Sequence, residues 1–344
     1  MREPGFWHRR SSWISVALAP LAALYGLVAG WRLQARGFDA GIPVLCVGNY
    51  HVGGAGKTPT VLALARLLGE LGERPVVLSR GYGGRLQGPI LVDPARHRSV
   101  DVGDEPLMLA AQVPVVVARD RIAGIALARS QRASVILMDD GFQNPAIAKD
   151  AALIVIDGDR GLGNGWVLPA GPLRAPLRPQ IERTDVLIVV GAGTAAGPVM
   201  AAVAARGGLV LSAHLRPDQA AVQSLRGKRV LAFAGIGDPA RFVRTLRSSG
   251  IEVVQQRFFA DHHPFSKAEI DALIAEAKHD ALTLVTTEKD LTRLHRPAEG
   301  LPCWANAIVP LPVTLEFADQ ARLRAFATER LFKARARRLA ANGR

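Results

Sequence analysis

The chain alternates short, continuous apolar runs with stretches whose apolar residues recur three and four positions apart. Continuous apolar runs indicate parallel strands buried on both faces, because a strand with one wet face alternates apolar and polar residues. The intervening stretches have the periodicity of amphipathic helices. The pattern therefore predicts an α/β fold with a doubly wound, mainly parallel sheet. The expected strands are 42–47, 75–79, 114–118, 135–138, 153–156 and 185–190, and the expected helices are 58–72, 104–112 and 119–131.

A second set of strands and helices begins near residue 225 and indicates a smaller α/β unit. Between the two sets, segment 191–208 is rich in Gly and Ala and is expected to contain a helix. The tail from Ala318 has helical character and carries many basic residues, which form either a solvated face or a contact with anionic lipid headgroups. In the second set we expect strands 229–234, 251–254 and 282–286 and helices 240–249 and 266–279; the basic residues of the tail are Lys333, Arg335, Arg337, Arg338 and Arg344.

The segment from Trp13 to Trp31 contains 19 residues without a charge. This length barely reaches a bilayer span, and Pro20 and two glycines weaken a spanning helix. Basic residues flank both ends, so they do not fix an orientation. A signal peptide, a buried core helix and a membrane-associated helix are the alternatives. We favour a helix that lies in the membrane interface, where Trp and Tyr are preferred.

Composition narrows the class of partner. The 43 Lys and Arg residues outnumber the 30 Asp and Glu residues, which gives a net charge of +13. Such a charge suits nucleic acid, an anionic membrane or a phosphorylated ligand. No tandem aromatic and basic motif is present in the sequence, so we expect no nucleic-acid partner. Cys46 and Cys303 form no CxxC or Cys/His cluster, which argues against a disulfide framework or a zinc site and suits a reducing compartment.

The segment from Gly48 to Thr60 is the most specific chemical signal. It joins the first expected strand to the first expected helix, which is the layout of a loop that binds the phosphates of a nucleotide triphosphate. Lys57 is predicted to reach the β- and γ-phosphates, and the Thr58 hydroxyl to ligate Mg²⁺. His51 stands where the strict pattern has Gly. The predicted nucleotide-binding residues are Val52, Gly53, Gly54, Ala55, Gly56, Lys57, Thr58 and Pro59.

Carboxylates follow two other expected elements. Asp139 and Asp140 end an apolar strand, where they could hold Mg²⁺ or simply form an Asp-Gly turn. Because a phosphate-binding loop lies upstream, we favour the metal. Asp104 and Glu105 precede a helix, and their spacing alone favours capping of that helix over a role as base for a substrate hydroxyl.

Three further motifs leave alternatives open. Asp261-His262-His263 suits a surface pair, a pair of metal ligands or a proton relay. Thr287-Glu-Lys-Asp290 resembles a guanine-reading motif only loosely, since its Asn is missing, and GTP is discounted. Arg80 lies in a glycine-rich strand exit and could meet a phosphate or belong to a plain turn.

Taken together, these segments resemble the tetraacyldisaccharide 4′-kinase family of the lipid A pathway. The motifs occur in one order from the first residues to about residue 290, and this shared order is specific. The resemblance also accounts for His51, because the family lacks the first glycine of the strict phosphate loop. The matching segments are Phe6-Trp7, Val47-Gly-Asn49, Val52–Pro59, Ser79–Gly83, Gly103–Pro106, Asp139–Gln143, Leu168–Arg174, Phe233–Gly237, Asp261-His262 and Thr287–Asp290.

The resemblance implies transfer of the ATP γ-phosphate to the 4′-hydroxyl of an acylated glucosamine disaccharide 1-phosphate. It implies an active site between two α/β domains, with Asp104 as the base, His262 as its partner and Lys57 on the phosphates. Asp104 and His262 lie in different expected domains, so we expect them to meet only on domain closure. Metal ligands would be Thr58, Asp139 and Asp140, and substrate-binding residues Asn49, Arg80, Glu105, Gln143 and Arg174.

The resemblance also implies association with the cytoplasmic face of the bacterial inner membrane through the N-terminal helix, without an obligate protein partner. The expected division is a membrane-associated helix (1–36), a P-loop kinase core (37–224), a smaller α/β domain (225–317) and a basic C-terminal helix (318–344). One position departs from the family, which usually has Glu where this chain has Ala175. If that Glu assists metal or substrate binding, Asp139, Asp140 or water must compensate.

Two other classes of function are compatible with the residues alone. One is a membrane-associated P-loop ATPase or switch protein without a small-molecule acceptor, whose ATP turnover would ignore the lipid disaccharide. The other is a non-catalytic protein that binds the membrane surface, which would tolerate the loss of Lys57.

Overall fold

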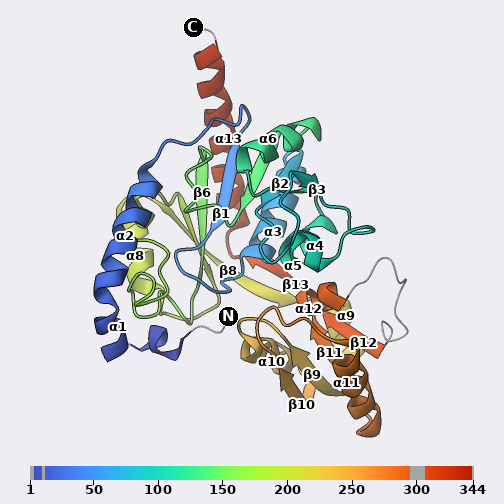
Figure 1. The fold of residues 1–344 in the computed structure, drawn as a ribbon. Coiled ribbons are helices and arrows are strands. Elements are labelled where there is room, and N and C mark those ends of the chain that lie inside the picture. Colours follow the sequence, from blue (N-terminus) through green and yellow to red (C-terminus); the bar gives the residue numbers. More distant parts are fainter. Residues whose placement is uncertain (1–3, 10–11, 295–306, 343–344) are drawn as a thin grey trace.

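The computed structural model describes residues 4–9, 12–294 and 307–342, so Cys303 and Arg344 lie outside the described residues. It contains a nine-stranded sheet and a four-stranded sheet, with helices packed on both (Figure 1). The large sheet has the order β13-β8-β7-β6-β1-β5-β2-β4-β3, and its strands are parallel except β3 and β13 at the two edges. The expectation of a doubly wound, mainly parallel sheet is confirmed. Its strands are β1 Val44–Gly48, β2 Pro75–Ser79, β3 Ile90–Leu91, β4 Val115–Val117, β5 Val135–Asp139, β6 Ala151–Asp157, β7 Val186–Val190, β8 Leu209–Pro217 and β13 Val313–Phe317.

Both faces of the large sheet are buried. In β1, Leu45 and Val47 join one apolar cluster, whereas Val44 and Cys46 join the cluster on the opposite face. Because successive side chains of a strand point to opposite faces, this double burial explains why the strands are continuously apolar in sequence. The helices of this unit are α3 Lys57–Glu70, α4 Ser99–Val102, α5 Asp104–Ala110, α6 Arg121–Ser130, α7 Leu177–Glu182, α8 Gly197–Ala205 and α13 Gln320–Asn342.

The small sheet has the order β10-β9-β11-β12 and is entirely parallel. The chain then returns to the large sheet, where β13 pairs antiparallel with β8. The sequence-based division places residues 313–317 with the smaller unit, whereas these hydrogen bonds place them in the large sheet. The smaller unit contains β9 Arg229–Ala234, β10 Glu252–Phe258, β11 Thr283–Thr287, β12 Ile308–Leu311, α9 Gln219–Leu225, α10 Pro239–Ser248, α11 Lys267–His279 and α12 Glu288–Leu294.

The apolar pattern does not reveal every element. Strand β8 alternates buried and exposed positions and carries Ser212, His214 and Arg216, so it lacks the continuous apolar run of the central strands. Segment 191–208 contains α8, as expected. The other elements absent from the sequence expectation are β3, β12, β13, α4, α7, α9 and α12, each short or irregular in its apolar spacing.

The N-terminal segment forms η1 Gly5–His8, α1 Trp13–Ala17 and α2 Ala19–Gln34. Helix α2 packs on the large unit through small residues, since the Cα positions of Gly26 and Gly30 lie against Pro176. The outer surface of α1 and α2 carries large apolar side chains, and Trp13 of α1 is 80% exposed and Trp31 of α2 is 75% exposed. Among the described residues, no helix combines the length and the apolar character needed to span a bilayer.

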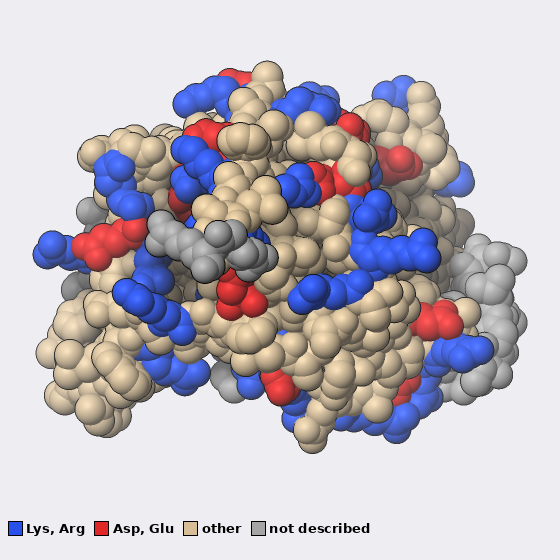
Figure 2. Space-filling model, turned by 90° about the horizontal axis from the view of Figure 1, so that it is seen from above, with Lys and Arg blue, Asp and Glu red and all other residues tan. Residues whose placement is uncertain are grey.

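The predicted C-terminal helix is confirmed as α13. Lys333, Arg335 and Arg337 are partly exposed, as expected of a solvated face, but their charges also pair with carboxylates. Arg335 pairs with Glu73, and Arg338 contacts both Asp39 and Asp150. Figure 2 views the end of the molecule from which α13 projects, and basic and acidic side chains are interleaved there. These ion pairs hold α13 on the large unit. Arg337 also pairs with Asp150, and Lys333 pairs with Glu329 within the helix.

Candidate active site between the two sheets

The loop between β1 and α3 has the backbone geometry of an anion cradle. Gly53 and Gly56 adopt φ values of 112° and 92°, a left-handed region that glycine enters without steric cost. Gly56 precedes α3 and no side chain caps the helix, so the first N–H groups of α3 are available to a ligand. Ala55 is buried, and a side chain added at Gly54 would meet open space. The loop can therefore wrap around phosphate oxygens.

Lys57 lies beside a carboxylate at the end of β5. Its Nζ atom is 3.8 Å from Oδ1 of Asp140, and Nη1 of Arg174 donates a hydrogen bond to the same oxygen at 2.7 Å. Burial would raise the pKa of Asp140, but the charges of Lys57 and Arg174 lower it to about 2. Asp140 is therefore a carboxylate at neutral pH, held between two cations that can also meet phosphate.

Asp139 presents an oxygen without a hydrogen-bond partner. Its side chain is buried, Ser79 donates to Oδ2 at 3.1 Å, and Oδ1 has no partner among the described residues. Burial and the charges of Glu105 and Asp140 raise the pKa of Asp139 to about 7. A buried carboxylate oxygen that lacks a donor is a suitable ligand for a hard cation.

The donor set fits Mg²⁺. Within the described part of the chain, no group of three or more His, Cys, Asp or Glu side chains could hold a metal ion by itself. Mg²⁺ bound with a nucleotide commonly uses one or two protein carboxylates, the substrate phosphates and water. Asp139, Asp140 and the hydroxyl of Thr58 at the start of α3 are compatible with that mode.

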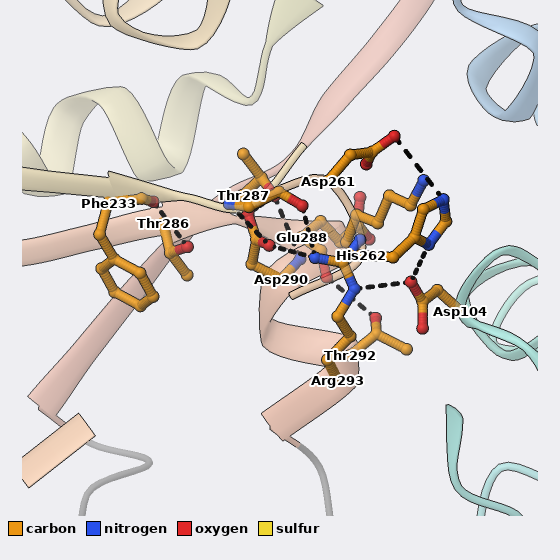
Figure 3. A network of polar contacts seen from close by, with 12 residues as sticks. Asp104, Phe233, Asp261, His262, Thr286, Thr287, Glu288, Asp290, Thr292 and Arg293 are labelled. Atoms are coloured by element: carbon orange, nitrogen blue, oxygen red, sulfur yellow. Dashed lines mark hydrogen bonds and ion pairs between the residues drawn. The ribbon is translucent and has the colours of Figure 1, made fainter. Parts of the chain in front are cut away.

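Asp104 and His262 meet at the interface of the two units (Figure 3). Oδ2 of Asp104 lies 2.7 Å from Nδ1 of His262 and accepts a hydrogen bond from Nε of Arg293 at 2.6 Å. Burial acts to raise the pKa of Asp104, but the contacts with His262 and Arg293 outweigh it, so the pKa lies below its ordinary value. The Asp104 side chain makes no capping hydrogen bond to α5, although Asp104 and Glu105 lie in its first turn, where a negative charge interacts favourably with the helix dipole.

The structure brings Asp104 and His262 into contact across the interface, which is the arrangement that we expected on domain closure. Other contacts cross the same interface: Lys289 Nζ lies 3.1 Å from Glu105 Oε1, and Arg241 Nη1 lies 2.5 Å from Asp157 Oδ2. Asp157 is the last residue of β6 in the large sheet. The other three partners, Glu105, Arg241 and Lys289, lie in the first turns of α5, α10 and α12. The carboxyl edges of the two sheets therefore face each other, and such edges are where α/β proteins bind ligands.

The two adjacent histidines have different roles. His262 contacts Asp104, and its Nε2 atom lies 3.8 Å from Oδ2 of Asp261. His263 instead contacts Glu269 at 2.9 Å and stacks on Phe259. The two histidines do not share a site, so they do not form a pair of metal ligands. His262 lies between Asp104 and the partly exposed Asp261, and these are the contacts that a proton relay would use.

The structure divides the predicted substrate-binding residues into two groups. Arg80 is exposed at the exit of β2, and Arg174 lies on Asp140. Asn49 and Gln143 instead support the phosphate loop: Asn49 Nδ2 donates to the Gly53 carbonyl at 3.2 Å, and Gln143 Nε2 donates to the Asn49 carbonyl at 2.7 Å.

Three site residues were missed from the sequence: Ser79, Lys289 and Arg293. Lys289 lies inside a motif that we noted, but only its contact with Glu105 reveals a role. Arg293 is three residues after Asp290 on α12, the spacing at which two helical side chains meet. Ala175 is fully buried and places no carboxylate at this position.

Comparison with known proteins agrees with this geometry. Residues 14–331 match the model of the family described as tetraacyldisaccharide-1-P 4′-kinase. The chain is 64% identical over 335 residues to a tetraacyldisaccharide 4′-kinase of Rhodopseudomonas palustris strain HaA2, covering 97% of this chain and 98% of the relative. It is 65% identical over 338 residues to the Bradyrhizobium diazoefficiens enzyme of the same name, covering 98% and 99%.

A solved structure has the same fold. The crystal structure of LpxK from Aquifex aeolicus, described as an "apo" form in complex with ATP, has a TM-score of 0.71 to this chain at 26% identity, covering 92% of this chain and 99% of that one. The chain therefore belongs to the tetraacyldisaccharide 4′-kinase family, enzymes of lipid A biosynthesis that phosphorylate the 4′ position of an acylated disaccharide phosphate with ATP.

Proposed function

We propose that the groups at the interface of the two sheets catalyse transfer of the γ-phosphate of ATP to the 4′-hydroxyl of an acylated glucosamine disaccharide 1-phosphate, with Asp104 as the base. The observation that carries this assignment is the contact of Asp104 with His262 across the interface. A carboxylate that is kept ionised and held by a histidine from the facing unit suits removal of a hydroxyl proton.

In this proposal, the loop after β1 binds the nucleotide. Its N–H groups bind the phosphates, and Lys57 moves from Asp140 toward the β- and γ-phosphates when ATP binds. Thr58, Asp139 and Asp140 would hold Mg²⁺, which neutralises charge on the phosphates. The oxygen of Asp139 without a partner supports this assignment. Because this chain has Ala175 where the family usually has Glu, Asp139, Asp140 and water would take over the role of that Glu.

The chemistry requires position and charge more than covalent assistance. The 4′-oxygen forms a bond to the γ-phosphorus while the bond from that phosphorus to the β,γ-bridging oxygen breaks, which releases ADP. The proton of the 4′-hydroxyl passes to Asp104, whose contact with His262 fixes the carboxylate. Arg80, Arg174 and Glu105 line the substrate side, and Asn49 and Gln143 act through the phosphate loop.

The lipid substrate also requires access to a membrane. We place the protein on the cytoplasmic face of the bacterial inner membrane, with α1 and α2 lying in the interface and no obligate protein partner. The exposed apolar face of these helices supports this position. We further propose a membrane-associated helix (1–36), a P-loop kinase core (37–224), a smaller α/β domain (225–317) and a basic C-terminal helix (318–344), amended so that β13 at 313–317 and α13 belong with the kinase core, on which they pack.

The decisive experiment incubates the protein with ATP labelled at the γ-phosphate and an acylated disaccharide 1-phosphate in detergent. We expect a labelled lipid product from the wild type and none from Lys57→Ala. Absence of labelled lipid from folded, ATP-binding protein would overturn the kinase assignment. ATP hydrolysis that is indifferent to the lipid would favour a switch ATPase, and full function of Lys57→Ala would favour a non-catalytic binding protein.

A further inference from the structure

Arg293, on α12 of the smaller unit, is enclosed at the interface and makes three polar contacts (Figure 3). Its Nε atom donates to Oδ2 of Asp104 at 2.6 Å. Its Nη1 atom donates to Oδ1 of Asp290 at 2.6 Å and to the Gly235 carbonyl at 2.7 Å. Only 4% of its side chain is exposed. We infer that Arg293 is a positioning residue that holds the Asp104 carboxylate in the orientation needed for phosphoryl transfer.

Arg293 is itself fixed by the smaller unit. Asp290 is fully buried, and it accepts hydrogen bonds from the Gly235 N–H at 3.1 Å and the Thr287 hydroxyl at 2.6 Å. The guanidinium that contacts Asp104 is therefore also held by the Gly235 carbonyl, which follows β9, and by Asp290, which follows β11. A planar guanidinium with two engaged nitrogens restricts its partner more than the single ammonium of a lysine does. The position of Asp104 is thus determined by the small sheet.

The contacts select one oxygen of the carboxylate. Both His262 Nδ1 and Arg293 Nε approach Oδ2 of Asp104, and Oδ1 accepts no hydrogen bond from the described residues. Two donors on Oδ2 prevent rotation of the carboxylate and leave Oδ1 for the proton of the substrate hydroxyl. This consequence rests on the proposed role of Asp104 as the base.

Removal of Arg293 should therefore change the pH dependence of kcat, in addition to any loss of stability. The charged groups that face Asp104 are His262, Arg293 and Lys289, together with Glu105 on its own helix. Loss of one cation leaves the ionised form of Asp104 less favoured, so its pKa rises. The acid limb of the kcat profile should then move to higher pH, whereas a purely structural role for Arg293 would lower the amount of folded enzyme without moving that limb.

The test compares Arg293→Met, Arg293→Lys and Arg293→Ala in the full chain. We expect kcat to fall about 10- to 100-fold in Arg293→Met, because this is the effect expected from loss of one charged hydrogen bond to Asp104. The KM for ATP should change less. Arg293→Lys should retain part of the activity, and millimolar guanidinium should partly restore Arg293→Ala. The matched control is Arg241→Met, which removes another arginine contact across the same interface, to Asp157, and should leave the acid limb in place.

A double-mutant cycle separates this inference from the assignment of Asp104. If Arg293 acts through Asp104, Arg293→Met should cost little further activity in an Asp104→Asn background. An unshifted acid limb in folded Arg293→Met, or full additivity with Asp104→Asn, would overturn the role of Arg293 alone. Near wild-type activity of Asp104→Asn would instead overturn the proposed base, whatever Arg293 does.

Discussion

At the scale of single residues, the pKa of each carboxylate in the proposed site depends on the charges that surround it. Asp139 and Asp140 are neighbours, but Asp140 lies between two cations, whereas Asp139 is buried with an oxygen that lacks a partner. The pKa of Asp140 is lowered to about 2 and that of Asp139 is raised to about 7. The same residue type thus acquires two different properties from its surroundings, as desolvation and opposite charges require.

The first prediction concerns Asp104. Replacement by Ala should lower kcat by about 10²- to 10⁴-fold, because the group that accepts the hydroxyl proton is lost. The KM for ATP should change far less, because the phosphates bind to the loop after β1. Steady-state kinetics with ATP and the lipid acceptor measure both quantities. Equal losses in turnover and ATP affinity would indicate a structural role for Asp104 at the start of α5.

At the scale of elements, the two helical segments that are candidates for membrane contact have different surroundings. Both α2 and α13 were considered for membrane contact. The arginines of α13 contact Asp39, Asp150 and Glu73 of the large unit, whereas α1 and α2 retain a bare apolar face. Partners for the charges of α13 could not be found from the sequence, because those carboxylates lie more than a hundred residues away.

A second prediction tests α1 and α2 as the membrane contact. The combined change Trp13→Ser, Leu24→Ser and Trp31→Ser should reduce binding to anionic vesicles at least about tenfold, since burial of each such side chain is worth about 1.5–3 kcal/mol. Co-sedimentation measures the bound fraction. The control Leu339→Ser removes a side chain of similar exposure on α13 and should bind as the wild type does. Equal binding of all variants would place the membrane contact elsewhere.

A third prediction concerns the ion pairs of α13. Arg338→Ala removes contacts to Asp39 and Asp150 and should lower the free energy of unfolding by about 1–3 kcal/mol at pH 7. Burial acts to raise the pKa of Asp39, but the Gly41 N–H and Arg338 outweigh it, so its pKa is lowered. A lowered pKa contributes stability above the unfolded pKa of about 3.9, and this contribution is lost as pH falls through the folded value.

The difference in stability between wild type and Arg338→Ala should therefore shrink in acid. Denaturant unfolding at a series of pH values measures it. Lys333→Ala is the control on the same helix, because among the residues that the structure describes Lys333 pairs only with Glu329, one turn away, and should matter little at any pH. A difference that is constant from pH 7 to pH 3 would show that packing of the Arg338 stem, rather than its charge, stabilises α13.

At the scale of the whole molecule, the proposed active site lies where the two sheets approach each other. The phosphate loop and Asp104 belong to the large unit, whereas His262 and Arg293 belong to the smaller one. Contacts across the interface include the ion pairs of Arg241 with Asp157 and of Lys289 with Glu105. The relative position of the two sheets therefore decides whether the proposed catalytic groups meet.

The fourth prediction tests this dependence. Arg241→Glu places a second negative charge against the buried Asp157 and should separate the two units. Small-angle scattering should report a larger radius of gyration, and kcat should fall although no proposed catalytic residue has changed. Arg244→Glu, on the same helix but paired with Asp238 within the smaller unit, is the control. Unchanged scattering and activity in Arg241→Glu would mean that other contacts hold the sheets together.

The sequence by itself determined the central strands, the phosphate loop and the family. These features are local: a buried parallel strand is continuously apolar, and a phosphate loop needs glycines and Lys-Thr at fixed spacing. The order of the motifs added the acceptor and the pairing of Asp104 with His262 through the resemblance.

Only the tertiary structure decided the partners of these residues. Arg293 lies 189 residues from Asp104, and no local pattern connects them. The return of β13 to the large sheet, the ion pairs of α13 and the support of the loop by Asn49 and Gln143 also depend on contacts between distant segments. Such contacts are set by how packed elements meet in space, which a single sequence does not encode in any fixed spacing.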